Sequence, residues 1–219
     1  DPNIEKFNKF RELFGDAEYL SLGIESRERD KDVFSLSTIQ VIHDITTMLE
    51  EHEFVTKVTS LSNYQYTHGS SGILSTDYLF PEIDSLTENN KKLKKARQII
   101  SNEKIAIDSL ITSDFKHTRI IARTEYIANE NDHKVKISRD IYEFLDKNDY
   151  KGRGYNIHLG GGAIIAERFE NLSARDSKIL NPLVAMIFCL ILWLLFGSFI
   201  CCLLPWVLIG SGLLMVKWL

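Results

Sequence analysis

The chain has 219 residues and a formal net charge of −4, so its charge gives no reason to expect a nucleic-acid partner. This length predicts one or two domains. Residues 1–178 are polar and charged, whereas residues 179–219 carry a single charge, Lys217. All three cysteines lie in the second part, so the first part offers neither a disulfide nor a thiolate metal site.

The first third of the chain predicts alternating helices and strands. Residues 1–16 predict a short amphipathic helix, and residues 17–25 alternate as a strand does. Residues 35–51 predict the clearest helix, and residues 54–61 form a β-branched strand. The helix carries one apolar stripe, made of Ile39, Ile42, Ile45 and Leu49.

Two N-terminal caps are equally good for that helix. Ser37 and Gln40 have the spacing of a capping box, and Ser35 can cap the helix alone. The sequence leaves both alternatives open.

Residues 62–116 are predicted to be an insertion. Residues 62–88 look irregular, and a connection of this length is usually functional or inserted. Residues 88–100 predict a helix with a basic face. Such a face is usually a solvated surface, and contact with anionic lipid is the alternative. Its basic residues are Lys91, Lys92, Lys94, Lys95 and Arg97.

The second half repeats the pattern of the first. Residues 117–126 predict a strand, 135–147 a helix, and 155–162 a strand that ends in three glycines. The two halves together predict an α+β fold over residues 17–162. Its βαββαβ order is the ferredoxin-like arrangement, with the insertion at its centre.

The last part of the chain predicts a transmembrane helical hairpin. The 38 residues from Ile179 to Val216 carry no charged side chain. As one helix they would extend about 57 Å, whereas one membrane crossing needs about 20 residues. A helical linker over residues 163–178 is therefore followed by a first membrane helix over about 180–196. The turn falls at Gly197–Ser198, and a second helix starts near Leu204.

The second membrane helix is expected to be truncated. It is still apolar at Leu219, so we expect the protein to continue beyond this residue. The alternative is a buried hairpin of a soluble protein, but a soluble core helix normally keeps one polar face. Neither half of residues 179–219 has such a face.

The sequence contains no recognisable catalytic motif. Gly160–Gly162 fits neither a dinucleotide fingerprint nor a P-loop, so we interpret it as a tight turn from strand to helix. No serine lies in a nucleophile elbow. The histidines show no ligand spacing, and all are expected at the surface or in loops: His43, His52, His68, His117, His133 and His158. We predict no catalytic, cofactor-binding or metal-binding residue, and substrate-binding residues stay unassigned.

Four segments, taken in order, resemble a known family. FRELFGDAEYLSLGIES (10–26) is followed by DVFSLSTIQVIHDITTMLEE (32–51) with VTKVTSLSN (55–63). LGGGAIIAERFENLSARDSKILNPL (159–183) leads into a helix pair that includes LLFGSFICCLLPWVLI. Together they resemble an RND-superfamily exporter of the MMPL-like, hydrophobe/amphiphile efflux branch, which is related to Patched-type and sterol-sensing proteins.

The resemblance implies an extracytoplasmic, periplasmic porter domain over residues 17–162. The second and third transmembrane helices of a multi-pass inner (plasma) membrane protein would follow it. The implied activity is proton-driven export or trafficking of lipids or other hydrophobic molecules, without a cofactor. The implied partners are membrane lipids, the cargo, further helices and a second porter domain, and a homo-oligomer is one possible assembly.

Two departures from the family pattern concern the membrane part. The family usually has arginine in the turn between these helices, where this chain has Gly197–Ser198. No ionisable Asp, Glu, His, Lys or Arg lies from Ile179 to Val216, so the proton relay is absent. These 219 residues alone are not expected to couple a proton gradient to transport. A membrane-anchored binding or sensing domain is the alternative function, and an enzyme is the least supported.

Overall fold

The computed structural model describes residues 6, 9–10, 18–28, 31–70, 73–83, 86, 91–125 and 132–197. The chain divides into two compact units, Asp1–Glu167 and Arg168–Leu219. Most of the predicted N-terminal helix and all of the predicted second membrane helix lie outside the described residues.

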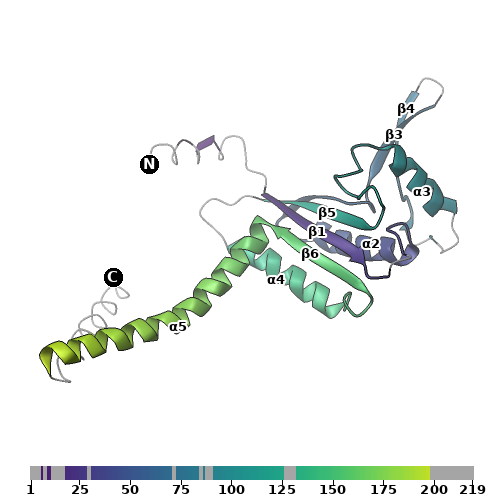
Figure 1. Ribbon diagram of the computed structural model, residues 1–219. Helices are drawn as coiled ribbons and strands as arrows, with labels where there is room; N and C mark the ends of the chain where they lie inside the picture. The colour runs from purple at the N-terminus through teal and green to yellow at the C-terminus, as the bar shows by residue number, and fades with distance from the viewer. Residues whose placement is uncertain are drawn as a thin grey trace. The chain divides into compact units, whose positions relative to one another are not determined.

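Four strands of the described residues form one antiparallel sheet in the order β2-β5-β1-β6 (Figure 1). Each strand falls where the sequence predicted one, and the mixed α/β fold with an antiparallel sheet is confirmed. The strands are β1 (Glu18–Ser26), β2 (Val55–Thr59), β5 (His117–Thr124) and β6 (Tyr155–Gly161).

The inner strand β1 supplies one face of the core. Leu20, Leu22 and Ile24 alternate along it and are at most 1 % exposed. Ala122 and Ile120 of β5 lie opposite the two leucines and are also buried. Fully burying a leucine or isoleucine side chain is worth about 1.5–3 kcal/mol. The period of two therefore fixes which face of the sheet the helices cover.

Helices α2 (Leu36–Glu50) and α4 (Asp132–Lys147) pack into the same core as β1. The whole predicted stripe of α2 is fully buried, as is Ile137 of α4. Of the two predicted caps the structure uses Ser35, whose hydroxyl accepts a hydrogen bond from the Thr38 backbone N–H at 3.3 Å. This bond satisfies one of the N–H groups that lack a partner at a helix start.

The expectation that every histidine lies at the surface or in a loop is wrong for one of them, His133. His133 is only 3 % exposed and lies in α4, on the same inward stripe as Ile137 and Ile141. The His52 side chain is only 8 % exposed, but the residue lies in the loop after α2, as the prediction allowed. The predicted helix began at residue 135, whereas α4 begins at Asp132. His133, which was expected in the preceding loop, therefore lies in the helix and is buried.

The insertion contains more regular structure than predicted. Residues 62–88 were expected to be irregular, but β3 (Gln65–Ser70) and β4 (Ile73–Tyr78) form a hairpin there. Most of their side chains are exposed, so no buried face imposes the alternation that marks a strand. Helix α3 (Lys91–Asn102) follows and buries Leu93, Ala96 and Ile100.

Helix α5 (Gly162–Phe196) joins two segments that were predicted separately. The linker over 163–178 and the first membrane helix form one helix, with Pro182 inside it. Of the described residues, one helix, Gly162–Leu195, is long and apolar enough to cross a membrane. Proline has no N–H, so the Lys178 carbonyl receives no hydrogen bond from residue 182.

Gly161 closes the turn between β6 and α5. Its φ is +122°, and an added Cβ would lie 2.3 Å from the backbone oxygen of Tyr19 on β1. At Gly160, the preceding residue, nothing lies within 4 Å of an added Cβ. The glycine run is thus a strand-to-helix turn that needs glycine at one position, as predicted.

We expect Gly161→Ala to destabilise the first unit by about 2 kcal/mol or more, because it combines backbone strain with a clash against β1. Gly160→Ala is the matched control and should change stability by less than about 1 kcal/mol. All eight tyrosines lie in this unit, so urea unfolding of the chain in detergent can be followed by its near-UV tyrosine signal. Equal losses in the two variants would contradict this account of the turn.

Tyr150 is a buried titratable group, only 1 % exposed. Its hydroxyl donates to Oδ2 of Asp44 at 3.4 Å. Burial, followed by the nearby Asp44 charge, raises the pKa of Tyr150 from 10 to about 12. In the folded protein the Tyr150 hydroxyl therefore keeps its proton at pH values where the same group of the unfolded chain has lost it.

This difference predicts that stability falls as pH rises from about 10 to 12. Between pH 9 and pH 11, ionisation of Tyr150 in the unfolded chain should lower the free energy of unfolding by about 1 kcal/mol. Tyr150→Phe cannot ionise, so its stability should decline less over the same interval. Urea unfolding of both proteins at pH 9 and 11 measures the difference, and parallel declines would contradict the raised pKa.

Candidate functional site

A groove of about 910 Å³ lies between helices α2 and α4. It is open to solvent and is not an enclosed cavity. The residues that line it are His43, Asp44, Thr47, Met48, Glu51, His52, Asp140, Glu143, Phe144, Lys147 and Asn148. The groove therefore joins side chains from two helices that lie far apart in the sequence.

The lining of the groove is acidic with an apolar component. Asp44 and Glu51 come from the α2 side, and Asp140 and Glu143 from α4. Lys147 is the only lysine or arginine among the residues that line it. The half-buried side chains of Met48 and Phe144 add apolar surface. Such a lining favours a ligand that combines a positive charge with an apolar part.

His52 connects the end of α2 with α4 at one side of the groove. Its Nδ1 accepts a hydrogen bond from the Phe54 backbone N–H at 3.3 Å. A neutral imidazole has one donor and one acceptor, so we assign the proton to Nε2. Nε2 then donates to Oδ2 of Asp140 at 3.3 Å. This bond crosses between the helices and holds both side chains in place.

An exposed ion pair lies near the same end. Lys136 of α4 pairs with Glu53, and its ammonium group lies 5.4 Å from the centre of the Phe54 ring. The hydrogen bond from Lys136 lowers the pKa of Glu53, and the same bond raises the pKa of Lys136. Both groups are solvated, so the pair adds little stability.

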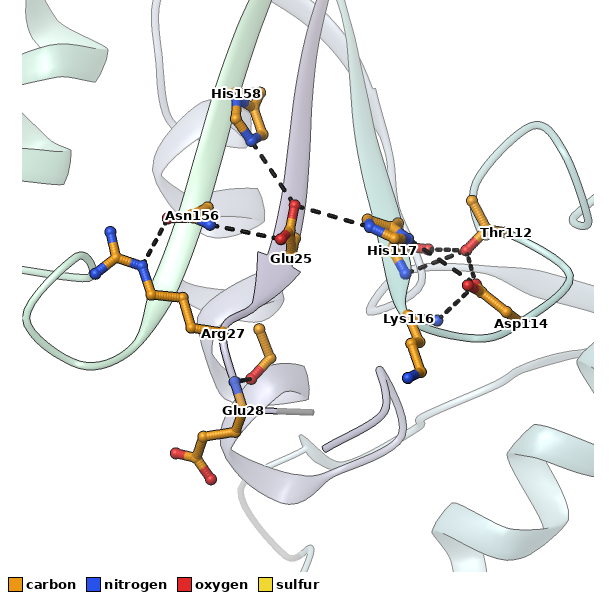
Figure 2. A network of polar contacts seen from close by, with 10 residues as sticks. Glu25, Arg27, Glu28, Thr112, Asp114, Lys116, His117, Asn156 and His158 are labelled. Carbon is orange, nitrogen blue, oxygen red and sulfur yellow. Dashed lines mark hydrogen bonds and ion pairs between the residues drawn. The ribbon is translucent and has the colours of Figure 1, made fainter. Parts of the chain in front are cut away.

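The open face of the sheet carries a separate polar network (Figure 2). Oε2 of Glu25 on β1 lies 3.7 Å from Nε2 of His117 on β5 and 3.9 Å from Nε2 of His158 on β6. Asn156 donates to Oε1 of Glu25 at 3.5 Å and accepts from Nε of Arg27 at 2.7 Å. The network spans three strands, but its distances and exposure make it a weak electrostatic cluster.

The network extends to Asp114 at the end of the insertion (Figure 2). The Thr112 hydroxyl donates to Oδ1 of Asp114 at 2.5 Å, and the backbone N–H of Lys116 donates at 3.0 Å. These bonds lower the pKa of the Asp114 carboxyl, with the hydroxyl as the main cause. Nδ1 of His117 lies 3.9 Å from the same oxygen.

Neither place has the geometry of a known catalytic constellation. Among the described residues, no group of three or more His, Cys, Asp or Glu side chains could hold a metal ion. The sequence named no residue of the groove as a site. The separation of 88 positions between His52 and Asp140 shows why: each helix is predictable from its own period, but that period does not say which helices meet.

Comparisons with known proteins identify the family. A model of the MMPL family matches residues 54–217, which is most of the chain. This match covers strands β2 to β6, the insertion and the whole of α5. A search of the curated proteins gives no match. The chain therefore belongs to the MMPL family, which indicates a membrane transporter of the RND superfamily.

Proposed function

We propose that residues 17–162 are the porter domain of a proton-driven exporter of lipids or other hydrophobic molecules. One observation carries the proposal: the family match runs without a break from β2 through the apolar helix α5. A single family thus unites strands β2 to β6 of the folded domain with the long apolar helix. Membrane lipids, a hydrophobic cargo, further helices and a second porter domain are the proposed partners.

We propose the ferredoxin-like class for this domain. Two strand-helix-strand halves, β1-α2-β2 and β5-α4-β6, contribute to one antiparallel sheet. The first strand of each half, β1 and β5, lies in the middle, and the second strands lie at the edges. The β3–β4 hairpin and α3 lie between the halves in the sequence. This order supports the split βαβ arrangement.

The exposed apolar surface of α5 supports the membrane assignment. Met186, Trp193 and Leu194 are 51–72 % exposed, although such residues are normally buried in soluble proteins. Lipid would cover this surface without a protein partner. We propose that a second apolar helix follows Gly197–Ser198, which makes a hairpin in a multi-pass protein of the inner (plasma) membrane.

Proton coupling is proposed to use residues outside these 219. A buried ionisable side chain in a membrane is costly and usually marks function. The apolar stretch from Ile179 to Val216 contains no such carboxylate, histidine, lysine or arginine. A pair of helices also has no interior through which cargo could pass. The alternative function is a membrane-anchored binding or sensing domain that does not pump.

Transport by the full-length gene product tests the proposal. Everted membrane vesicles that contain it should accumulate a fluorescent phospholipid analogue when their interior is made acidic. A protonophore should abolish this accumulation, because it removes the driving force. Vesicles with residues 1–219 alone should show no gradient-dependent accumulation.

Two other outcomes would contradict parts of the proposal. Binding of the lipid analogue without any response to the gradient would favour the anchored binding domain. Gradient-dependent accumulation by residues 1–219 alone would show that these residues carry their own coupling group.

Cysteine labelling tests the proposed orientation, with the soluble domain outside the cytoplasm. In a version with all three native cysteines replaced, Thr67→Cys and Ser198→Cys are made separately. A membrane-impermeant maleimide added to intact cells should label the Thr67→Cys variant and leave the Ser198→Cys variant unlabelled. The reverse pattern would place the soluble domain in the cytoplasm, and lysed cells provide the control for reactivity.

A further inference from the structure

The hairpin of β3 and β4 is a sheet of its own within the described residues. Figure 1 shows it projecting from the insertion beside α3. Its register is continuous from Gln65↔Tyr78 to Ser70↔Ile73. A two-stranded hairpin alone is marginally stable in water, so pairing with an additional strand would stabilise this hairpin.

The hydrogen-bond pattern identifies the backbone groups at the outer edge of β4. The Leu79 N–H donates to the Tyr64 carbonyl at 2.8 Å, so these residues form a hydrogen-bonded pair. In an antiparallel ladder such pairs alternate with pairs whose backbone groups point outward. Counting back from Leu79, the residues whose N–H and C=O groups point outward are Leu74, Thr76 and Tyr78.

Among the described residues, no further strand pairs with this edge of β4, and its sequence offers little protection against pairing. Proteins protect exposed edges with lysine, proline, bulges or a covering element. Strand β4 (ILSTDY) contains no lysine or proline and one charge, Asp77. Leu74 is 79 % exposed and Tyr78 52 % exposed, so apolar surface lies directly beside the outward backbone groups.

We propose that β4 pairs with β4 of a second copy of this chain, forming a continuous sheet β3-β4-β4-β3. A two-fold axis at Thr76 brings the two Thr76 residues opposite each other. Leu74 of each copy then lies opposite Tyr78 of the other, because both are two residues from the axis. This inference does not depend on the proposed transport function.

The charge pattern favours a second copy as the occupant of this edge. The residue at the axis is uncharged, so no like charges meet there. On the opposite face of the sheet, Asp77 of each copy lies across from Ser75 of the other, not from the second Asp77. The strand is therefore complementary to itself in this register, and two of its three exposed apolar side chains, Leu74 and Tyr78, cover each other.

Disulfide trapping tests this register. In the version without native cysteines, Thr76→Cys places two thiols at the axis, within the Cα separation that a disulfide accepts. Thr67→Cys is the matched control, because Thr67 lies opposite Thr76 in the hairpin and is equally exposed. The two Thr67 positions would be three strand spacings apart, about 14 Å.

Mild oxidation of the full 219-residue chain in detergent should give disulfide-linked dimers of the Thr76→Cys variant, at least five times more than of the Thr67→Cys variant. No dimer from the Thr76→Cys variant, or equal amounts from both, would overturn the proposal.

Association without any cross-link gives a second, independent measurement. Thr76→Lys places two like charges at the axis and should weaken self-association at least tenfold, as measured by light scattering of the chain in detergent. Thr67→Lys adds the same charge one strand away and should leave association within twofold of the original. Equal association of the two variants would overturn the proposal, as would a monomeric original chain whose hairpin instead binds lipid vesicles through Leu74.

Discussion

The burial of one face of β1 is the constraint on which the sheet domain depends. Leu20, Leu22 and Ile24 belong to the same buried core as side chains of α2 and α4, while the strand itself lies between β5 and β6. A shift of one residue in its register would turn all three side chains to the open face and bring Tyr19 and Glu25 inward. The positions of α2 and α4, and so of the groove between them, follow from this register.

The elements with a buried face were predictable because burial imposes a period. The stripe of α2 and the alternation of β1 identified both elements, and the glycine run was correctly interpreted as a turn. The β3–β4 hairpin was missed because most side chains on both of its faces are exposed to solvent. His133 was misplaced because a helix start is uncertain by a few residues, although its spacing of four from Ile137 already indicated the inward stripe.

The groove could not be predicted in the same way. Its residues belong to surfaces that periodicity assigns to solvent, and only the packing of α2 beside α4 makes them neighbours. The net charge of α4 gives no sign of the acidic cluster, since its four acidic residues are balanced by Lys134, Lys136, Arg139 and Lys147. The identity of the family came from the order of several loose motifs, which is information that no single site contains.

The pairing of β1 with β6 has a consequence for how such a domain can be accommodated in a membrane protein. Leu20 lies opposite Gly161, so the chain enters and leaves the folded domain at neighbouring points on adjacent strands. Inserting a domain with adjacent ends between two helices costs little loop-closure entropy, because the helices need not separate to hold it. The domain is thus a closed excursion of the chain, and its entry on β1 and its exit on β6 lie side by side.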